Sequence, residues 1–152
     1  MFLQRALYVR AVPVGWGGAA LSAFSAERAA RYRVDGITGL FLLHEARALH
    51  VLEGPEAGMR SHLSRILLDD PARAIDLRYC EFTAARLFDD WSLCRLRPGP
   101  GADGEAALRC FDLVCAVQDP VMFDLGLRCL RLLKSQSLPL WPPQAALAAL
   151  AA

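Results

Sequence analysis

The chain opens with a segment in which apolar and polar positions follow the period of a strand, and it then changes to the period of a helix. Residues 2–12 alternate with a repeat of two, which places Tyr8 and Arg10 on the same face of a strand. Residues 19–34 repeat their apolar positions at helical spacing. We expect this helix to end at Gly36, because glycine suits the left-handed conformation that caps helices.

Two apolar runs come next, and a short polar turn separates them. They cover residues 37–43 and 48–52, so the turn at residues 44–47 predicts a β-hairpin. A second helix is expected through residue 68, with Pro55 at its first position. Its apolar stripe consists of Met59, Leu63, Ile66 and Leu67.

The remaining pattern adds strands at residues 75–82 and 92–96 and then two amphipathic helices. Asp119 is suited to cap the last helix, with Pro120 in its first turn. The expected apolar residues of the third helix are Leu108, Phe111 and Cys115, and those of the fourth are Met122, Leu125, Cys129 and Leu132.

This order of elements predicts an α+β fold of the ferredoxin-like βαββαβ type with one added strand. The first two helices then cover one face of the sheet, and we expect the two C-terminal helices to cover the other. The predicted organisation is a domain over residues 1–97, a linker over 98–104, a helical cap over 105–137 and a flexible tail over 138–152.

Composition narrows the classes of function. The 152 residues are 55% hydrophobic with a formal net charge of +1, which suits one domain with a core. There is no basic stripe with interleaved aromatic residues and no apolar run of membrane-spanning length, so we expect a cytoplasmic protein that binds neither nucleic acid nor membrane. Five cysteines without a CxxC pair suit a reducing compartment, and no metal site is expected.

Motifs for catalysis are missing from the sequence. It contains no P-loop, nucleophile elbow or HExxH motif. The paired carboxylates of Asp89 and Asp90 lie beside Trp91 in an expected loop, where turn formation explains them. We therefore expect a protein that is not an enzyme.

Three short sequence motifs resemble those of a known family. They are Gly-Ile-Thr-Gly-Leu at residues 36–40, Leu-Glu-Gly-Pro at 52–55, and Arg-x-Phe-x-x-Trp-Ser at 86–92. Over about residues 7–96 the chain resembles BLUF domains, which are small flavin-binding blue-light sensors. The resemblance implies an FAD whose ring lies between the two helices that cover the sheet. It also implies a light switch made by a tyrosine on the first strand and a glutamine on the third.

The resemblance assigns the switch positions to residues of this chain. Tyr8 matches the tyrosine, and Trp91 matches the tryptophan of the Arg-x-Phe-x-x-Trp-Ser motif. His50 stands at the position of the glutamine. The family's switch needs an amide that exchanges donor for acceptor, and an imidazole does not reproduce that exchange.

Further positions that hold the flavin in the family carry different residues here. Tyr32 stands in place of an asparagine, Arg10 in place of a small hydroxyl residue, and Leu93 in place of a methionine. Arg31 precedes Tyr32 on an arginine-rich helix that either meets the phosphates of a dinucleotide or is solvated. Arg10 either faces inward, where it needs a carboxylate or an acidic ligand, or extends to solvent. The added bulk of these side chains is expected to weaken flavin binding or to fill the flavin slot outright.

His50 has three interpretations. It is a heme or metal ligand, a pH-sensitive switch, or a packed histidine that hydrogen-bonds to Tyr8 or Tyr32. A lone histidine on an apolar strand is usually of the last kind, and this interpretation is favoured.

The sequence therefore predicts a non-enzymatic sensory or regulatory protein that resembles the BLUF family. It would signal through contacts with a partner regulatory protein, or with itself, through the C-terminal helices or the sheet. Flavin binding is expected to be weakened or altered and normal blue-light photochemistry to be lost. Two alternatives stay open: an FAD-binding blue-light or redox photoreceptor with a modified switch, and an interaction module without cofactor. A sensor of another small molecule is a third, weaker option.

Overall fold

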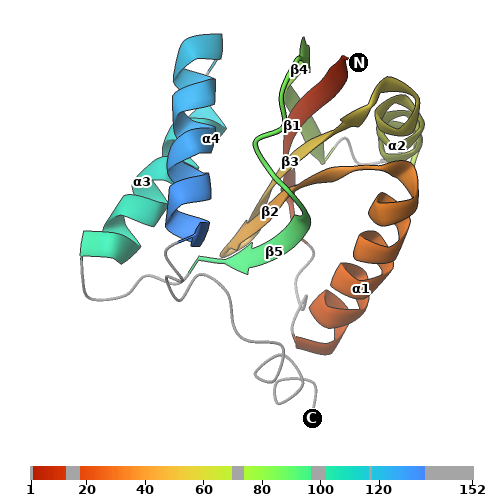
Figure 1. Ribbon diagram of the computed structural model, residues 1–152. Coiled ribbons are helices and arrows are strands. Elements are labelled where there is room, and N and C mark those ends of the chain that lie inside the picture. Colours follow the sequence, from red (N-terminus) through yellow and green to blue (C-terminus); the bar gives the residue numbers. More distant parts are fainter. Residues whose placement is uncertain (1, 13–17, 70–73, 97–101, 117, 136–152) are drawn as a thin grey trace.

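A five-stranded sheet lies between two pairs of helices in the computed structural model (Figure 1). The structure describes residues 2–12, 18–69, 74–96, 102–116 and 118–135. The elements in chain order are β1 (Leu3–Ala11), α1 (Gly18–Asp35), β2 (Thr38–His44), β3 (Arg47–Pro55), α2 (Glu56–Leu68), β4 (Ile75–Thr83), β5 (Trp91–Arg95), α3 (Ala102–Ala116) and α4 (Pro120–Ser135).

The strand order β4-β1-β3-β2-β5 confirms the ferredoxin-like arrangement with an added strand. The pairs β1–β3, β1–β4 and β2–β3 are antiparallel, and β5 joins β2 in parallel. Helices α1 and α2 cover one face of the sheet and α3 and α4 cover the other, as predicted (Figure 1). The central strand β3 is buried continuously from Ala48 to Gly54.

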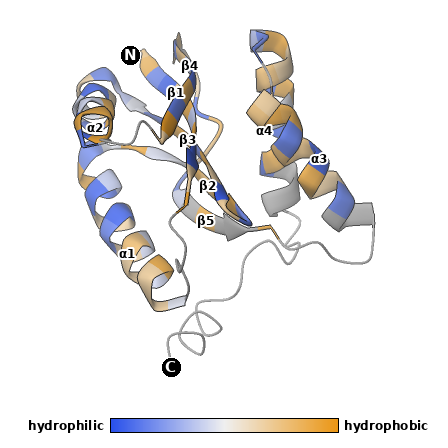
Figure 2. Ribbon diagram, turned by 180° about the vertical axis from the view of Figure 1, so that it is seen from behind, coloured by the Kyte–Doolittle hydropathy of each residue, from blue (hydrophilic) through white to orange (hydrophobic). Residues whose placement is uncertain are grey.

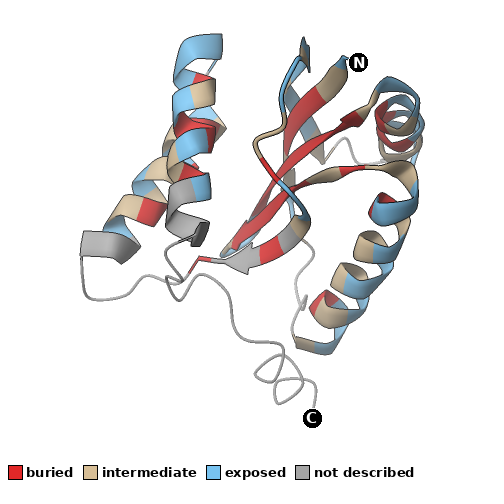
Figure 3. Ribbon diagram, in the orientation of Figure 1, coloured by how far each residue is buried: buried red, intermediate tan, exposed pale blue. Residues whose placement is uncertain are grey.

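Each face of the sheet has its own core. Figure 3 shows buried residues along the central strands and exposed ones on the outer sides of the helices. Figure 2 shows that the helices carry both hydrophilic and hydrophobic residues, as amphipathic helices do. The core under α3 and α4 contains Leu7, Leu40, Leu49, Val51, Phe111, Val114, Phe123 and Leu127. The core under α1 and α2 contains Tyr8, Leu21, Tyr32, Phe41, Leu52 and Met59.

Two glycines fix the path from α1 into β2. Gly36 has φ 65, so it adopts the left-handed conformation predicted for the end of the helix. Gly39 has φ 149, and a Cβ there would lie 2.0 Å from the carbonyl oxygen of Val51. The strands β2 and β3 can approach at this point only because residue 39 lacks a side chain.

The predicted apolar stripe of α2 is only partly correct. Met59 and Leu63 are buried, but Leu67 is 46% exposed, and the buried position on that helix is His62 instead. The buried side of α2 differs from the predicted one because the helix packs on β1 and β3. This packing brings positions 59, 62 and 63 to the sheet. Pro55 is the N-cap of α2 and not its first helical residue.

The predicted apolar side of α4 is wrong, although its cap is correct. Asp119 Oδ1 accepts hydrogen bonds from the backbone N–H groups at positions 121 and 122, at 2.9 and 3.1 Å. Met122 and Leu125 are 40% and 50% exposed. The inward side is set by Phe123, which stacks on Tyr79 with ring centroids 3.9 Å apart. The residues that are buried on this helix are Phe123, Leu127 and Leu130.

One predicted domain boundary, the one between the linker and the helical cap, falls within the described residues. Helix α3 begins at Ala102, so the last residues of the predicted linker 98–104 are helical. The rest of that linker and the tail at 138–152 lie outside the described residues. Within the described part of the chain, every helix is too short or too polar to cross a membrane.

A buried ion pair joins the sheet to the loop before β5 and to α4. The Glu53 side chain is fully buried, and its Oε2 accepts a hydrogen bond from Arg5 Nε at 3.0 Å. Glu53 Oε1 accepts from the backbone N–H groups of Leu87 and Phe88 at 2.8 and 2.7 Å. Arg5 also donates to the carbonyl oxygen of Ala85 and to Asp124 on α4.

We predict that Glu53→Gln lowers the free energy of unfolding by about 3–5 kcal/mol, because it leaves the buried Arg5 guanidinium without its buried carboxylate and with only the partly exposed Asp124 as a charged partner. Denaturant unfolding followed by circular dichroism measures the change. The control is Glu56→Gln, which breaks an exposed pair with Arg60 and should change stability by less than about 1 kcal/mol. Equal effects of the two substitutions would contradict the assigned importance of the buried pair.

Candidate functional site

The structure brings Tyr8 and His50 together on the sheet face that α1 and α2 cover. They are directly opposite each other in the β1–β3 register. Their rings stack with centroids 4.3 Å apart and planes 14° apart, and both residues are 2% exposed. Phe41 on β2 contacts the other side of His50, with centroids 4.4 Å apart and an edge-on geometry. His50 is therefore held between two aromatic rings.

His62 on α2 forms the hydrogen bonds that we expected of His50. Its Nε2 lies 3.4 Å from the Tyr8 hydroxyl and 3.3 Å from the Tyr32 hydroxyl. Tyr32 comes from α1, so these contacts join both helices to the sheet. His50 is packed, as the favoured interpretation predicts, but the predicted hydrogen bond to Tyr8 or Tyr32 is wrong. Neither ring nitrogen of His50 has a hydrogen-bond partner among the described residues.

The tautomer of His62 follows from its second contact. Arg65 Nη2 lies 3.2 Å from His62 Nδ1, and a guanidinium can only donate. His62 Nδ1 is therefore the acceptor, and in the neutral ring Nε2 carries the hydrogen that faces Tyr8 and Tyr32. We call Tyr8, Tyr32 and His62 the ring trio.

Burial keeps the rings of the site uncharged. It lowers the pKa of His62 from its ordinary value of 6.5 to about 3, and Arg28 and Arg65 lower it further in the same direction. Burial also lowers the pKa of His50 well below its ordinary value, helped by Arg10. It raises the pKa of Tyr32 to about 12 and that of Tyr8 well above its ordinary value. All four rings are neutral near pH 7.

The other residues singled out in the sequence lie around these rings. Trp91 meets Tyr32 edge-on with centroids 5.6 Å apart, and its Nε1 is buried without a hydrogen-bond partner. Leu93 is buried in the apolar cluster beside Phe41. Arg10 has a buried Nε and lowers the pKa of both Tyr8 and His50, so it faces the site rather than solvent.

Arg31 lies at the edge of the site. It is partly buried on α1 and acts electrostatically on Tyr32 and His62. No contact of Arg31 with either ring is present among the described hydrogen bonds, so it contributes charge rather than a fixed contact.

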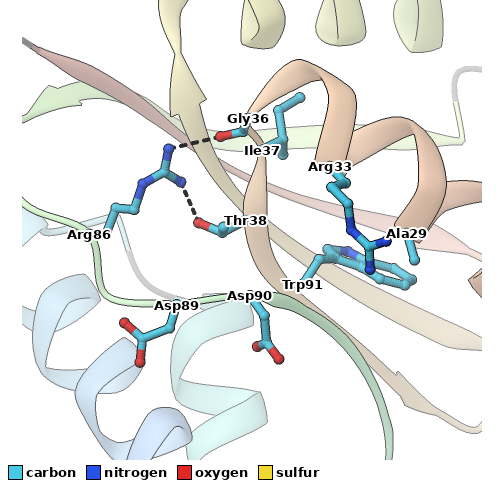
Figure 4. Close-up of a pocket in the computed structure, with 9 residues that line it drawn as sticks. All are labelled: Ala29, Arg33, Gly36, Ile37, Thr38, Arg86, Asp89, Asp90 and Trp91. Atoms are coloured by element: carbon cyan, nitrogen blue, oxygen red, sulfur yellow. Dashed lines mark hydrogen bonds between the residues drawn. The ribbon is translucent and has the colours of Figure 1, made fainter.

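A cleft opens on the far side of Trp91, between the end of α1 and the loop before β5. Its volume is about 400 Å³. Arg86 spans one side and donates to Thr38 Oγ1 and to the carbonyl oxygen of Gly36, while Arg33 lies beside the Trp91 indole (Figure 4). The lining residues are Ala29, Arg33, Gly36, Ile37, Thr38, Arg86, Asp89, Asp90 and Trp91.

The comparisons with known proteins bear on this arrangement. The BLUF family, described as sensors of blue-light using FAD, matches residues 3–94, which is more than half of the chain. The chain belongs to the BLUF family. A BLUF domain is a flavin-binding sensor and not a catalyst. No curated protein matches the chain.

Solved structures share the BLUF fold with this chain. The photo-activated state of BlsA is 14% identical with a TM-score of 0.67, covering 86% of this chain and 95% of BlsA. Klebsiella pneumoniae BlrP1 with FMN and cyclic diGMP is 25% identical with a TM-score of 0.59, covering 81% of this chain and 34% of BlrP1. A bacterial light-regulated adenylyl cyclase is 15% identical with a TM-score of 0.55, covering 97% and 39%. The chain thus spans about two fifths or less of the two larger proteins.

The residues of this BLUF domain fit a flavin ring poorly. In the family the ring lies between the two helices that here contribute Tyr32 and His62. These side chains are each 1% exposed, and their polar atoms bond to one another and to Tyr8. A flat ring system could enter only if Tyr32 and His62 moved apart. The described residues also bring no group of three potential metal ligands together.

His62, which the sequence analysis missed, is important in this site, and so is Arg28, which belongs to the arginine-rich helix expected either to meet phosphates or to be solvated. His62 could have been found, because Met59, His62 and Ile66 are also at helical spacing. Arg28 is on the same side of α1 as Leu21, and its guanidinium lies over the Phe24 ring at 5.1 Å. Its electrostatic effect reaches all three members of the ring trio and His50.

We predict that stability falls as the pH is lowered from about 6.5 toward 4. The unfolded chain binds protons at its histidines in this range, whereas His62, with a folded-state pKa of about 3, does not. Each such group gives a slope of about 1.4 kcal/mol per pH unit. His62→Gln should remove one such slope in denaturant unfolding measured across this range. An unchanged slope in His62→Gln would contradict the assignment.

Proposed function

We propose that this chain is a sensory or regulatory BLUF module that acts through protein contacts and whose flavin slot is closed by its own side chains. One observation carries the proposal: Tyr32 from α1 and His62 from α2 meet between the helices at 3.3 Å and are both bonded to the sheet through Tyr8. Normal blue-light photochemistry is then lost and flavin binding is weakened.

The energetics support a closed slot. Opening it would break the buried hydrogen bonds of the ring trio, and each polar group left without a partner costs about 1–3 kcal/mol. The packing of Tyr32 on Trp91 would be lost as well. A flavin would have to compensate for these losses without the asparagine and glutamine amides that hold its polar edge in other members of the family.

The chemistry at position 50 supports the loss of the light switch. His50 is fixed by stacking on Tyr8 and by the edge of Phe41. A ring turn of an imidazole puts a carbon where each nitrogen was, whereas the family's switch depends on an amide that presents oxygen or nitrogen. The Tyr8 hydroxyl is also turned to His62 rather than kept for a flavin edge.

The C-terminal helices support signalling by contact. Val121, Met122 and Leu125 form an exposed apolar strip on α4, with 76%, 40% and 50% of each residue exposed. Apolar strips of this kind are typical of protein contact surfaces. Arg5 joins α4 to β1 through Asp124, so a change on the sheet has a route to this surface. The occupant is a partner regulatory protein or a second copy of the chain.

One observation favours the alternative of a flavin-binding photoreceptor with a modified switch. Both ring nitrogens of His50 and Nε1 of Trp91 are buried without hydrogen-bond partners. A bound group with polar edges would satisfy them. We rank this alternative second because Tyr32 and His62 are buried and bonded to each other between the helices.

The proposal predicts that the purified protein is colourless and retains no FAD after incubation and desalting. The variant Tyr32→Asn/Arg10→Ser/His50→Gln/His62→Leu restores the small or amide groups and should retain FAD, with affinity at least about tenfold higher than the parent. Visible absorption measures the retained flavin. The control is Arg33→Ser/Glu56→Gln, which changes exposed residues of α1 and α2 and should leave the protein colourless.

Three results would contradict the proposal. Flavin bands in the unaltered protein that shift to the red under blue light would establish a working photoreceptor. Flavin bands that do not shift would establish a binding site that has lost its switch. Failure of the fourfold variant to bind FAD would contradict the assignment of those side chains as the cause of closure.

A further inference from the structure

Strand β4 forms one edge of the sheet, and one of its faces carries exposed apolar side chains. It is nine residues long, it pairs only with β1 in the described part of the chain, and most of it is exposed (Figure 3). Helix α4 covers its other face, where Phe123 stacks on Tyr79. On the face toward α1 and α2, Leu77 is 40% exposed, Phe82 is 58% exposed, and Cys80 is an exposed free thiol. A long edge strand of this kind is a template for pairing with another strand.

An extra residue in the middle of β4 decides which side chains share that face. Leu77 pairs with Tyr8 and Cys80 with Ala6, and both partners belong to the core under α1 and α2. Three positions separate Leu77 from Cys80, so in a regular strand they would point to opposite faces. The register shift leaves Arg78 as an extra residue, a β-bulge, which brings them to one face. We call Leu77, Cys80 and Phe82 the edge patch.

A second copy of β4 fits this edge as an antiparallel strand related by a two-fold axis. Residues that are opposite each other in such a pair point to the same face of the sheet. When the bulge is counted as one extra residue, a register centred on Cys80 sets Leu77 opposite the partner's Phe82. It also sets Tyr79 opposite the partner's Glu81, on the other face. The two exposed apolar residues of each copy are then covered by those of the other.

The charges on β4 favour this register over its two neighbours. Asp76, Arg78 and Glu81 are all exposed. Arg78 is next to Tyr79 and therefore lies beside the partner's Glu81, so opposite charges come close on both sides of the axis. A register centred on Glu81 would set the two Glu81 carboxylates against each other, and one centred on Tyr79 would set Asp76 against the partner's Glu81. Like charges directly opposite each other are destabilising, so the carboxylates disfavour both alternatives.

We propose that two copies of this chain pair through their β4 edges about a two-fold axis at Cys80, so that their two sheets join. The assembly is closed, because the edge patch of one copy covers that of the other and β4 no longer has a free edge. The proposal rests on the proposed function in one respect, that the module acts through protein contacts. It assigns the second copy to the sheet edge and leaves the apolar strip of α4 to a regulatory partner.

The test is sedimentation velocity of the full chain under reducing conditions, with the flavin content of each sample read from its absorption spectrum. The unaltered protein is expected to form a dimer whose population rises with concentration. Phe82→Glu places a carboxylate opposite the partner's Leu77 and should raise the dissociation constant of the dimer at least about tenfold. The matched control is Leu68→Glu, at a position of α2 that is 84% exposed, and it should leave the dimer unchanged.

A cross-link tests the register in the unaltered protein. Opposed Cβ atoms of an antiparallel pair lie about 4.5–5.5 Å apart, so the two copies of Cys80 would be within reach of a short bifunctional thiol reagent. The unaltered protein should give a covalent dimer with this reagent, and Cys80→Ser should give none. This measurement keeps the proposal testable if Phe82→Glu does not fold.

The outcomes separate this proposal from the closed flavin slot. A colourless protein that stays monomeric overturns the paired edge and leaves the closed slot standing. A dimer that Phe82→Glu leaves intact, or that cross-links without Cys80, overturns the paired edge as well. A dimer that is dissociated by Leu125→Glu and not by Phe82→Glu would place the second copy on α4 instead. A protein that carries flavin and dimerises through Cys80 overturns the closed slot and still supports the paired edge.

Discussion

The buried carboxylate of Glu53 is the constraint on which the rest of the site depends. It accepts hydrogen bonds from Arg5 on β1 and from the backbone at positions 87 and 88, so it joins the centre of the sheet to the loop that leads into β5. The neighbouring Arg86 fixes the same loop, because it donates to the carbonyl oxygens of Gly36 and Glu53. The loop ends at Trp91, and its fixed path sets where the indole can meet the helices.

Above this fixed base, the buried neutral rings of Tyr32 and His62 meet between α1 and α2, and arginines lie around them. Tyr32 packs against Trp91 on one side and bonds to His62 on the other, so the position set by the loop extends to α2. Burial keeps His62 neutral, and a neutral His62 can take one hydrogen bond from Arg65 while its other nitrogen faces the tyrosines. The ring trio thus depends on the same burial that makes a charged histidine unfavourable there.

The fold could be predicted from the sequence because its determinants are local and periodic. The turn glycines, the strand alternation and the Asp119 cap act within a few residues, and the order of the elements along the chain predicts the topology. The site could be predicted only in part. Strand alternation predicts that Tyr8 and His50 face the same side of the sheet. The hydrogen bond between His62 and Tyr32 joins two residues 30 positions apart on different helices. Helical spacing alone could not identify His62, because Leu63 fits the buried side of α2 equally well. The wrong side of α4 has the same origin: its inward face is set by a contact with Tyr79 on β4, which helical spacing does not encode.

The determinants of the fold and of the flavin slot are physically separate in this chain. Gly39 is required because a Cβ would collide with the backbone of Val51, and that requirement holds whether or not a ligand is present. The buried Arg5–Glu53 pair is likewise a requirement of the folded chain alone, since either charge without the other is strongly unfavourable. The requirements at Gly39 and Glu53 are therefore met whatever side chains stand at positions 10, 32 and 50. A BLUF domain can keep its sheet, turns and loop while these three positions carry Arg10, Tyr32 and His50, as they do in this chain.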